Sequence, residues 1–370
     1  MIYFDNAATT KVIKKACDAA ISAMEINFAN PSSLHSLGIS AEKIVKEARA
    51  SISDALSCEP DEIFFTSCGS ESNNLAIFGA AARSGKKKHM ITTAFEHPSV
   101  LECAKRLEAT GYEVTYISPR PDGLVWPADV ADAVREDTFL VSVMSVNNEV
   151  GSVMDIPAIS KAVRMKNRET LIHTDAVQAF LKLPINASRY GADLISVSGH
   201  KIHAPKGIGA LYVRRGLRLA PRLLGGGQES GLRSGTEATS QLAAFSVAVD
   251  DAKEKITENA NEIKRLSEML VSELEILPGV HVFEPFSRAP HILSVAFEKY
   301  PSEVSMRLLE ESEIYVSAGS ACSRGKKSHV LRELNVPERL ISSTVRISLS
   351  RFSTEDEIRT FISAVKEKLI

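Results

Sequence analysis

Between about residues 62 and 214, short apolar runs alternate with segments whose apolar residues recur at helical spacing. The runs are bounded by polar residues, which is typical of strands buried on both faces of a parallel sheet. They lie at 63–66, 90–93, 113–117, 139–144, 171–174, 194–197 and 210–213. Because strands separated by helices form crossover units, the pattern predicts an α/β fold with a mostly parallel sheet flanked by helices.

The pattern changes after the glycine run at 225–227. One long amphipathic helical region is predicted over 240–277, with Leu266, Leu270 and Leu274 on its apolar face and a stop at Pro278-Gly279. Further elements are expected as strands at 291–297, 314–316 and 345–349, a helix at 302–311, and a last helix that Ser353 or Thr354 caps and that continues to Ile370. We therefore predict a large α/β domain over 13–252 and a smaller α+β domain built from 1–12 and 253–370.

Composition supports two domains, because 370 residues exceed what one small core usually holds. A hydrophobic content of 44% and a net charge of −2 are ordinary for a globular protein, so neither nucleic acid nor a membrane is expected as a partner. The start of the chain lacks a basic segment followed by an apolar core, so no signal peptide is expected. The five cysteines include no Cys-x-x-Cys pair, which favours a reducing cytoplasm over a disulfide framework or a cysteine-rich metal site.

Candidate chemistry begins where the apolar run at 192–197 ends. Ser198-Gly199-His200-Lys201 follows it and places an amine at the carboxyl end of a predicted buried strand. Ligands of open α/β sheets bind at such ends. A lysine held there, out of bulk water, can lose its proton and attack a carbonyl carbon, as in enzymes that bind pyridoxal phosphate.

Other predicted strand ends supply what pyridoxal phosphate needs besides an amine. Asp175 offers a carboxylate for the pyridine nitrogen, and Gln178 lies three residues later. The turn that contains Gly69 and Ser70 joins a strand to a helix, which is a common phosphate site. His97 follows another strand and is a candidate for stacking on the ring. Taken singly, Asp175 is equally suited to cap a helix, and a lone histidine is more often structural.

Together, these segments resemble the cysteine desulfurases of the NifS/IscS type in the class V aminotransferase superfamily. The resemblance covers nearly the whole chain, and the motifs occur in the same order as in that family. They lie at 3–10, 29–35, 69–74, 96–97, 147–151, 175–178, 198–201, 225–229, 233–236, 319–322 and 345–348.

The resemblance implies a fold like that of the PLP-dependent transferases and a pyridoxal 5'-phosphate (PLP) site. It assigns Lys201 to the covalent link with PLP and to transfer of the substrate Cα proton, and His97 to stacking on the ring. Asp175 then pairs with the ring nitrogen, and Gln178 contacts the phenolic oxygen. The phosphate is held by Gly69, Ser70, Ser198 and His200, and by Thr236 from the second subunit of a homodimer. Asn148 and Arg346 bind the substrate carboxylate, for which a guanidinium group is well shaped.

Cys322 selects the reaction within the superfamily. It lies in a glycine-rich segment with Arg324, Lys326 and Lys327 close by, and such cations favour the thiolate. The resemblance implies that Cys322 attacks the sulfur of L-cysteine and becomes a persulfide while L-alanine leaves. The sulfur then passes to an acceptor protein, for iron–sulfur cluster assembly or for another thiolation.

Two alternatives stay open from the sequence. One keeps the cofactor but changes the reaction, to a selenocysteine lyase or another class V aminotransferase. The other is a catalytically silent scaffold that binds sulfur carriers. The segment after Cys322 is shorter than in the housekeeping enzymes, and the chain ends at Ile370 without their scaffold-docking tail, so the sequence does not identify the acceptor. The sequence also assigns no role to His203.

Overall fold

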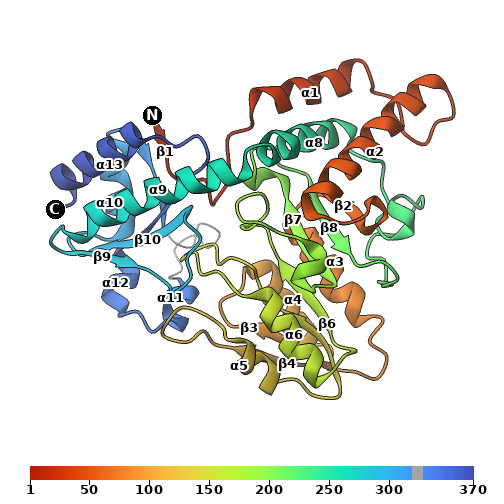
Figure 1. The fold of residues 1–370 in the computed structure, drawn as a ribbon, viewed down its shortest axis with the longest axis horizontal. Helices are drawn as coiled ribbons and strands as arrows, with labels where there is room; N and C mark the ends of the chain where they lie inside the picture. Colours follow the sequence, from red (N-terminus) through yellow and green to blue (C-terminus); the bar gives the residue numbers. More distant parts are fainter. Residues whose placement is uncertain (319–327) are drawn as a thin grey trace.

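A computed structural model describes residues 1–318 and 328–370, so Cys322 lies outside the described residues. A seven-stranded sheet and a four-stranded sheet organise this part of the chain. We call the seven-stranded sheet with its helices the large unit, and the four-stranded sheet with its helices the small unit. Both chain termini lie in the small unit (Figure 1).

The seven-stranded sheet has the order β2-β8-β7-β6-β5-β3-β4. Its strands are β2 (Ile63–Thr66), β3 (His89–Thr93), β4 (Glu113–Ile117), β5 (Thr138–Ser142), β6 (Leu171–Asp175), β7 (Leu194–Ser198) and β8 (Gly209–Val213). The pairs from β7 to β4 are parallel, whereas β8 is antiparallel to β7 and to β2. The predicted mostly parallel sheet is therefore confirmed.

Helices cover both faces of this sheet because successive strand residues point to opposite sides. Met90, Leu140 and Leu194 pack with α3 (Gly69–Ala81) and α4 (Pro98–Glu108) on one face. Their chain neighbours Ile91, Val141 and Ile195 belong to the core on the other face. The helices of the large unit with residues in that second core are α1 (Lys14–Glu25), α2 (Ser36–Leu56), α5 (Pro127–Asp132), α6 (Ile156–Lys166), α7 (Ala187–Tyr190) and α8 (Thr239–Lys253).

The small unit is antiparallel, with strand order β12-β13-β10-β9. Its strands are β9 (Val280–Phe283), β10 (Ile292–Phe297), β12 (Ser317–Ala318) and β13 (Thr344–Ser348). Its helices are α9 (Ile256–Glu275), α10 (Ser302–Glu310), α11 (His329–Glu333), α12 (Glu338–Ser343) and α13 (Glu355–Lys368). The start of the chain joins it, because β1 (Ile2–Tyr3) pairs in parallel with β11 (Ile314–Tyr315), and Phe4 packs edge-on against Phe361.

The single helix expected over 240–277 is wrong. The chain forms α8 and α9 instead, and Lys255 between them leaves helical geometry with φ −125° and ψ 24°. The two helices have different partners: α8 packs on α1 and α2, whereas α9 packs on β9 and α13. One straight amphipathic helix cannot pack against both sets of elements. The periodicity of the sequence does not show where the packing partners change.

Other boundaries differ by a few residues. The strand expected to continue to Met144 ends at Ser142, and the amide of Met144 donates to the carboxylate of Glu96 (2.8 Å). The strand expected at 314–316 is β11 and ends at Tyr315, and a separate strand, β12, follows Val316. Thr354, not Ser353, caps the last helix, in a capping box with Glu357. Strands β1 and β9 were not predicted.

No helix among the described residues is long and apolar enough to cross a membrane.

A buried ion pair is formed by Glu229, which lies just after the glycine run at 225–227, and Arg49. Glu229 is 8% exposed and accepts from both terminal nitrogens of Arg49, at 2.9 and 2.7 Å. The same carboxylate accepts from the amide of Phe65 in β2 (2.8 Å). The pair thus ties α2 and β2 to the segment before Thr236.

Replacing Glu229 with Gln is expected to lower the free energy of unfolding by about 2 to 3 kcal/mol, because Arg49 keeps a buried charge without its partner. Urea denaturation followed by circular dichroism measures the loss. The control is Glu47→Gln, which removes the carboxylate of an exposed helical pair with Lys43 and should cost less than about 0.5 kcal/mol. Equal losses in the two variants would contradict this role of Glu229.

Candidate active site

A cavity of about 430 Å³ opens where the carboxyl ends of β6 and β7 meet the N-terminal ends of α3 and α4. Its size is in the range typical of small-molecule sites. Its lining includes ten of the predicted residues, namely Gly69, Ser70, His97, Asn148, Asp175, Gln178, Ser198, His200, Lys201 and Arg346. Thr236 is exposed and is not among the lining residues. Cys322 lies outside the part of the chain that the structure describes.

Lys201 projects from a short 3-10 helix, Gly199–Lys201, that follows β7 directly. Its ammonium donates to the carbonyl oxygens of Ala7 (2.5 Å) and Ala8 (2.6 Å). The side-chain amide of Gln178 donates to the same Ala7 carbonyl (2.9 Å). The N-terminal segment, which the sequence did not assign to the site, therefore positions two of the predicted residues.

Asp175 and His97 are joined by a chain of hydrogen bonds. The amide of Asn73 donates to Asp175 Oδ2 (2.7 Å) and to Ser99 Oγ (2.8 Å). Ser99 Oγ lies 2.8 Å from His97 Nδ1, and the backbone amide of Ser99 donates to the same nitrogen (3.1 Å). These contacts assign an acceptor role to Nδ1 and the ring proton to Nε2. Burial lowers the pKa of His97, so the ring is neutral at physiological pH.

Sequence reasoning missed the roles of Asn73 and Ser99. Asn73 is fully buried one turn into α3, and Ser99 follows Pro98 at the start of α4. Neither position differs in the sequence from an ordinary polar residue at a helix start. Their roles depend on α3 and α4 lying side by side, which only the fold shows.

The N-terminal end of α3 is suited to binding an anion. Its first amides lack partners within the helix, and they carry the positive end of the helix dipole. A side chain at Gly69 would place a Cβ 2.6 Å from Val177 Cγ2, so the close packing there requires glycine. Ser198 Oγ is buried with no hydrogen-bond partner among the described residues, and it lines the same cavity. This unsatisfied hydroxyl beside a helix start fits the phosphate group of PLP.

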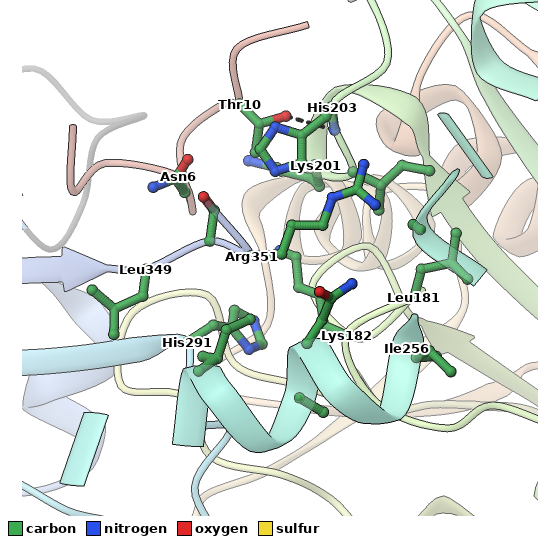
Figure 2. A pocket seen from close by; sticks show the side chains of 16 residues that line it. Asn6, Thr10, Leu181, Lys182, Lys201, His203, Ile256, His291, Leu349 and Arg351 are labelled. Carbon is green, nitrogen blue, oxygen red and sulfur yellow. Dashed lines mark hydrogen bonds between the residues drawn. The ribbon is translucent and has the colours of Figure 1, made fainter. Parts of the chain in front are cut away.

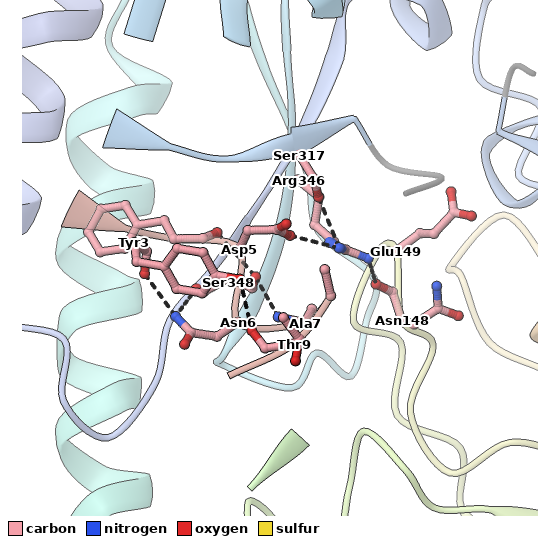
Figure 3. Close-up of polar contacts among 12 residues, drawn as sticks. Tyr3, Asp5, Asn6, Ala7, Thr9, Asn148, Glu149, Ser317, Arg346 and Ser348 are labelled. Carbon is pink, nitrogen blue, oxygen red and sulfur yellow. Dashed lines mark hydrogen bonds and ion pairs between the residues drawn. The ribbon is translucent and has the colours of Figure 1, made fainter. Parts of the chain in front are cut away.

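Arg346 connects the two units at the cavity (Figure 3). It extends from β13, is 2% exposed, and donates to the Asn148 carbonyl oxygen (2.8 Å), to Asp5 Oδ1 (3.0 Å) and to Ser317 Oγ (2.9 Å). Its Nε has no hydrogen-bond partner among the described residues. The guanidinium is thus fixed in place, and two of its five N–H groups, one at Nε and one at Nη1, have no hydrogen-bond partner among the described residues.

Two buried glutamates near the cavity, Glu149 and Glu96, were also not predicted from the sequence. Glu149 lines the cavity, and Ser328 donates to its carboxylate (2.5 Å). Burial raises the pKa of Glu149 to about 7, although Arg346 opposes the shift. Glu96 is fully buried, and burial, with a smaller contribution from Asp175, raises its pKa to about 8. Both lie in motifs singled out for their neighbours, and the sequence alone did not show their burial.

His203 does not line this cavity. Its backbone has φ +70°, its amide donates to Thr10 Oγ1 (2.8 Å), and its Nδ1 lies 2.8 Å from the Lys11 carbonyl oxygen. His203 therefore anchors the segment that follows the Ala7 and Ala8 carbonyls, and it lines a second cavity behind Lys201.

Comparisons with known proteins agree over nearly the whole chain. Residues 2–361 match the aminotransferase class-V family. A cysteine desulfurase IscS of Methanosarcina thermophila is 38% identical over 370 residues, which cover 99% of this chain and 91% of the relative. A cysteine desulfurase IscS of Azotobacter vinelandii is 42% identical over 368 residues, covering 96% and 90%. A solved structure of a NifS-like protein aligns with a TM-score of 0.93 at 38% identity, covering 99% of this chain and 98% of the other.

The raised pKa of Glu149 predicts a pH dependence of stability. In the unfolded chain this carboxyl ionises near 4.5, whereas in the folded protein it keeps its proton up to about pH 7. Its contribution is therefore complete below about 4.5 and is lost as the pH rises to about 7. Replacing Glu149 with Gln removes this loss. Relative to the wild type, the variant should gain about 2 to 3 kcal/mol in free energy of unfolding between about pH 5 and pH 8.

Urea denaturation across this pH range tests the prediction, with the exposed substitution Glu310→Gln as control. Parallel curves for wild type and Glu149→Gln would show that Glu149 ionises normally in the folded protein.

Proposed function

Since the chain belongs to the class V aminotransferase family and resembles its cysteine desulfurases in sequence and fold, we propose that it uses pyridoxal 5'-phosphate to remove sulfur from L-cysteine. The products are L-alanine and a persulfide on Cys322. The observation that carries the proposal is the convergence of Lys201, Asp175, His97 and the unsatisfied Ser198 hydroxyl on one cavity at the strand ends.

The lining residues suit each part of the cofactor. Lys201 would hold the aldehyde carbon, and Asp175, fixed by Asn73, would pair with the ring nitrogen. His97, neutral and fixed by Ser99, would lie against the ring. Gly69, Ser70, Ser198 and His200 would bind the phosphate. Burial, reinforced by Lys201, lowers the pKa of His200 to about 3, so it would bind as a neutral imidazole.

When bound, PLP supplies an electron sink for the bonds at the substrate Cα. The protein supplies binding and proton transfer. Arg346 and Asn148 would bind the substrate carboxylate, since Arg346 lines the cavity and keeps N–H groups without a partner among the described residues. Lys201 would remove the Cα proton and return it to the product. The carbonyls of Ala7 and Ala8 place its amine on the side of the cavity where β7 ends.

Cys322 would act as the sulfur acceptor within the enzyme. Its thiolate attacks the substrate sulfur, the carbon–sulfur bond breaks, and Cα and Cβ receive protons to give alanine. The overall change converts L-cysteine and one thiol into L-alanine and one persulfide, so it needs no external oxidant. This role rests on the sequence around Cys322, where Arg324, Lys326 and Lys327 favour the thiolate.

We also propose that two copies of the chain form a homodimer. Apolar side chains are exposed along α1, α2 and the segment between them, and Phe28 (67%) and Leu34 (95%) are the most exposed of these. Such a surface is unusual on a monomer. Thr236 is exposed and outside its own chain's cavity, which fits a residue that completes the phosphate site of a partner. The persulfide sulfur then passes to an acceptor protein.

Adding L-cysteine to the PLP-loaded protein should give alanine and a persulfide at Cys322, measured by amino-acid analysis and mass spectrometry. Replacing Cys322 with Ala should abolish cysteine turnover but spare selenocysteine, because selenium leaves carbon without a protein thiol. Cysteine turnover that survives in Cys322→Ala would refute the proposed sulfur transfer. A wild type that turns over neither substrate would favour the silent scaffold.

Replacing Ser198 with Ala should weaken PLP binding about fivefold to tenfold, because the phosphate loses one hydrogen bond. Fluorescence titration of the cofactor-free protein measures this. Binding of pyridoxal, which lacks the phosphate, should not change. Ser160→Ala is the matched control, because Ser160 is equally buried but lies on α6, away from the cavity. Equal weakening for PLP and pyridoxal would place Ser198 elsewhere than at the phosphate.

A further inference from the structure

A second cavity lies behind Lys201, under the first turns of α9 where the two units meet (Figure 2). Its volume of about 40 Å³ has room for a few water molecules or one small ion. The two cavities share one described lining residue, Lys201. The lining consists of Asn6, Thr10, Leu181, Lys182, Lys201, Ile202, His203, Ala252, Ile256, Asn259, Ala260, Ile263, His291, Leu349, Ser350 and Arg351.

The charges around this rear cavity are unbalanced. Lys182, Lys201 and Arg351 are basic, and none of the described lining residues is Asp or Glu. Arg351 has a carboxylate partner outside the lining, Asp251 at 2.8 Å, but Asp251 is also paired with Lys15 at 3.1 Å. The protein therefore places more positive than negative charge at this point of the interface.

Lys182 is the least compensated of these cations. Its only hydrogen bond among the described residues is to Gln178 Oε1 (3.1 Å), and no described carboxylate lies within 4.0 Å of its nitrogen. An ammonium has three donors, so two have no acceptor among the described residues. Burial, with Lys201 and Arg346 nearby, lowers the pKa of Lys182 to about 7. An anion in the cavity would offset the free-energy cost of burying a charged Lys182.

Two further nitrogens of the lining lack partners. His291 is 2% exposed, and its Nε2 has no hydrogen bond among the described residues. The Nε of Arg351 is also buried without a partner. Buried polar atoms of this kind are usually satisfied by a bound molecule when the protein offers none. In the absence of an anion, burial and Lys182 keep His291 neutral; a bound anion would favour its protonated, donating form.

From this arrangement we propose that the rear cavity binds a small monovalent anion, held by Lys182 with Arg351 and His291. The size of the cavity excludes phosphate esters and larger carboxylates. Much of the wall is apolar, with Leu181, Ile202, Ile256 and Ile263. Because entry into such a wall requires loss of water, weakly hydrated ions such as bromide and thiocyanate bind better than sulfate.

The site is connected to the catalytic cavity by hydrogen bonds. Lys182 donates to Gln178, and Gln178 and Lys201 both donate to the Ala7 carbonyl. An anion that keeps Lys182 charged therefore stabilises the orientation of Gln178. This inference goes beyond the proposed desulfurase reaction, and its test does not depend on turnover.

Chlorine NMR line width in solutions of the PLP-loaded protein tests the proposal. In wild-type protein, chloride should show excess broadening that saturates and that thiocyanate displaces, with ionic strength held constant by sodium gluconate. Replacing Lys182 with Met should weaken chloride binding about tenfold or more, because a charge-assisted contact is lost. Lys161→Met, which removes an exposed lysine on α6, should bind chloride as the wild type does.

The proposal is wrong if wild-type protein shows no saturable broadening, or if Lys182→Met retains all of it. A second measurement does not depend on the variant being folded. Crystals of the wild-type protein soaked in bromide should show anomalous scattering density between Lys182 and His291. Bromide found only elsewhere in the molecule would overturn the assignment.

Discussion

The buried guanidinium of Arg346 is the contact on which the geometry of the active site depends. It extends from the small sheet, is 2% exposed, and donates to Asp5 of the N-terminal segment and to Asn148 of the large unit. The same N-terminal segment is held again by Asn6, whose amide donates to the Ser348 carbonyl oxygen (2.9 Å). It then places the carbonyls of Ala7 and Ala8 against Lys201. The position of the Lys201 amine in the large unit therefore depends on the small unit.

The cost of burial decides which groups around the cavity carry charge. Among the described residues, no cationic side chain lies at hydrogen-bond distance from the buried carboxyl groups of Glu96 and Glu149, and the pKa of each is raised. His97 and His200 are neutral for the same reason, with their pKa values lowered. Asp175 is held in place by two donors, the Asn73 side chain and the Val177 amide, which bind its oxygens.

The strands of the large sheet could be predicted from the sequence because each is a short apolar run with polar ends. The site could be predicted in part for the same reason, since Asp175, Ser198 and Lys201 follow such runs directly. Asn73, Ser99, Glu149 and the Ala7 carbonyl could not, because each acts through a partner distant in sequence. The break at Lys255 was missed for a related reason. Helices α8 and α9 pack on different units, and helical periodicity does not indicate which part of the protein an apolar helix face packs against.

The placement of Lys201 between two cavities has a consequence for its chemistry. A lysine that exchanges protons with a substrate must lose and regain charge, and its neighbours determine how easily it does so. Asp175 and Arg346 line the active-site cavity in front of Lys201. Lys182 and Arg351 line the rear cavity, whose described lining residues include no acid. An anion bound behind the amine would interact favourably with a positive charge on it. Because such coupling is reciprocal, the protonation of Lys201 would in turn change the affinity of the rear cavity for an anion.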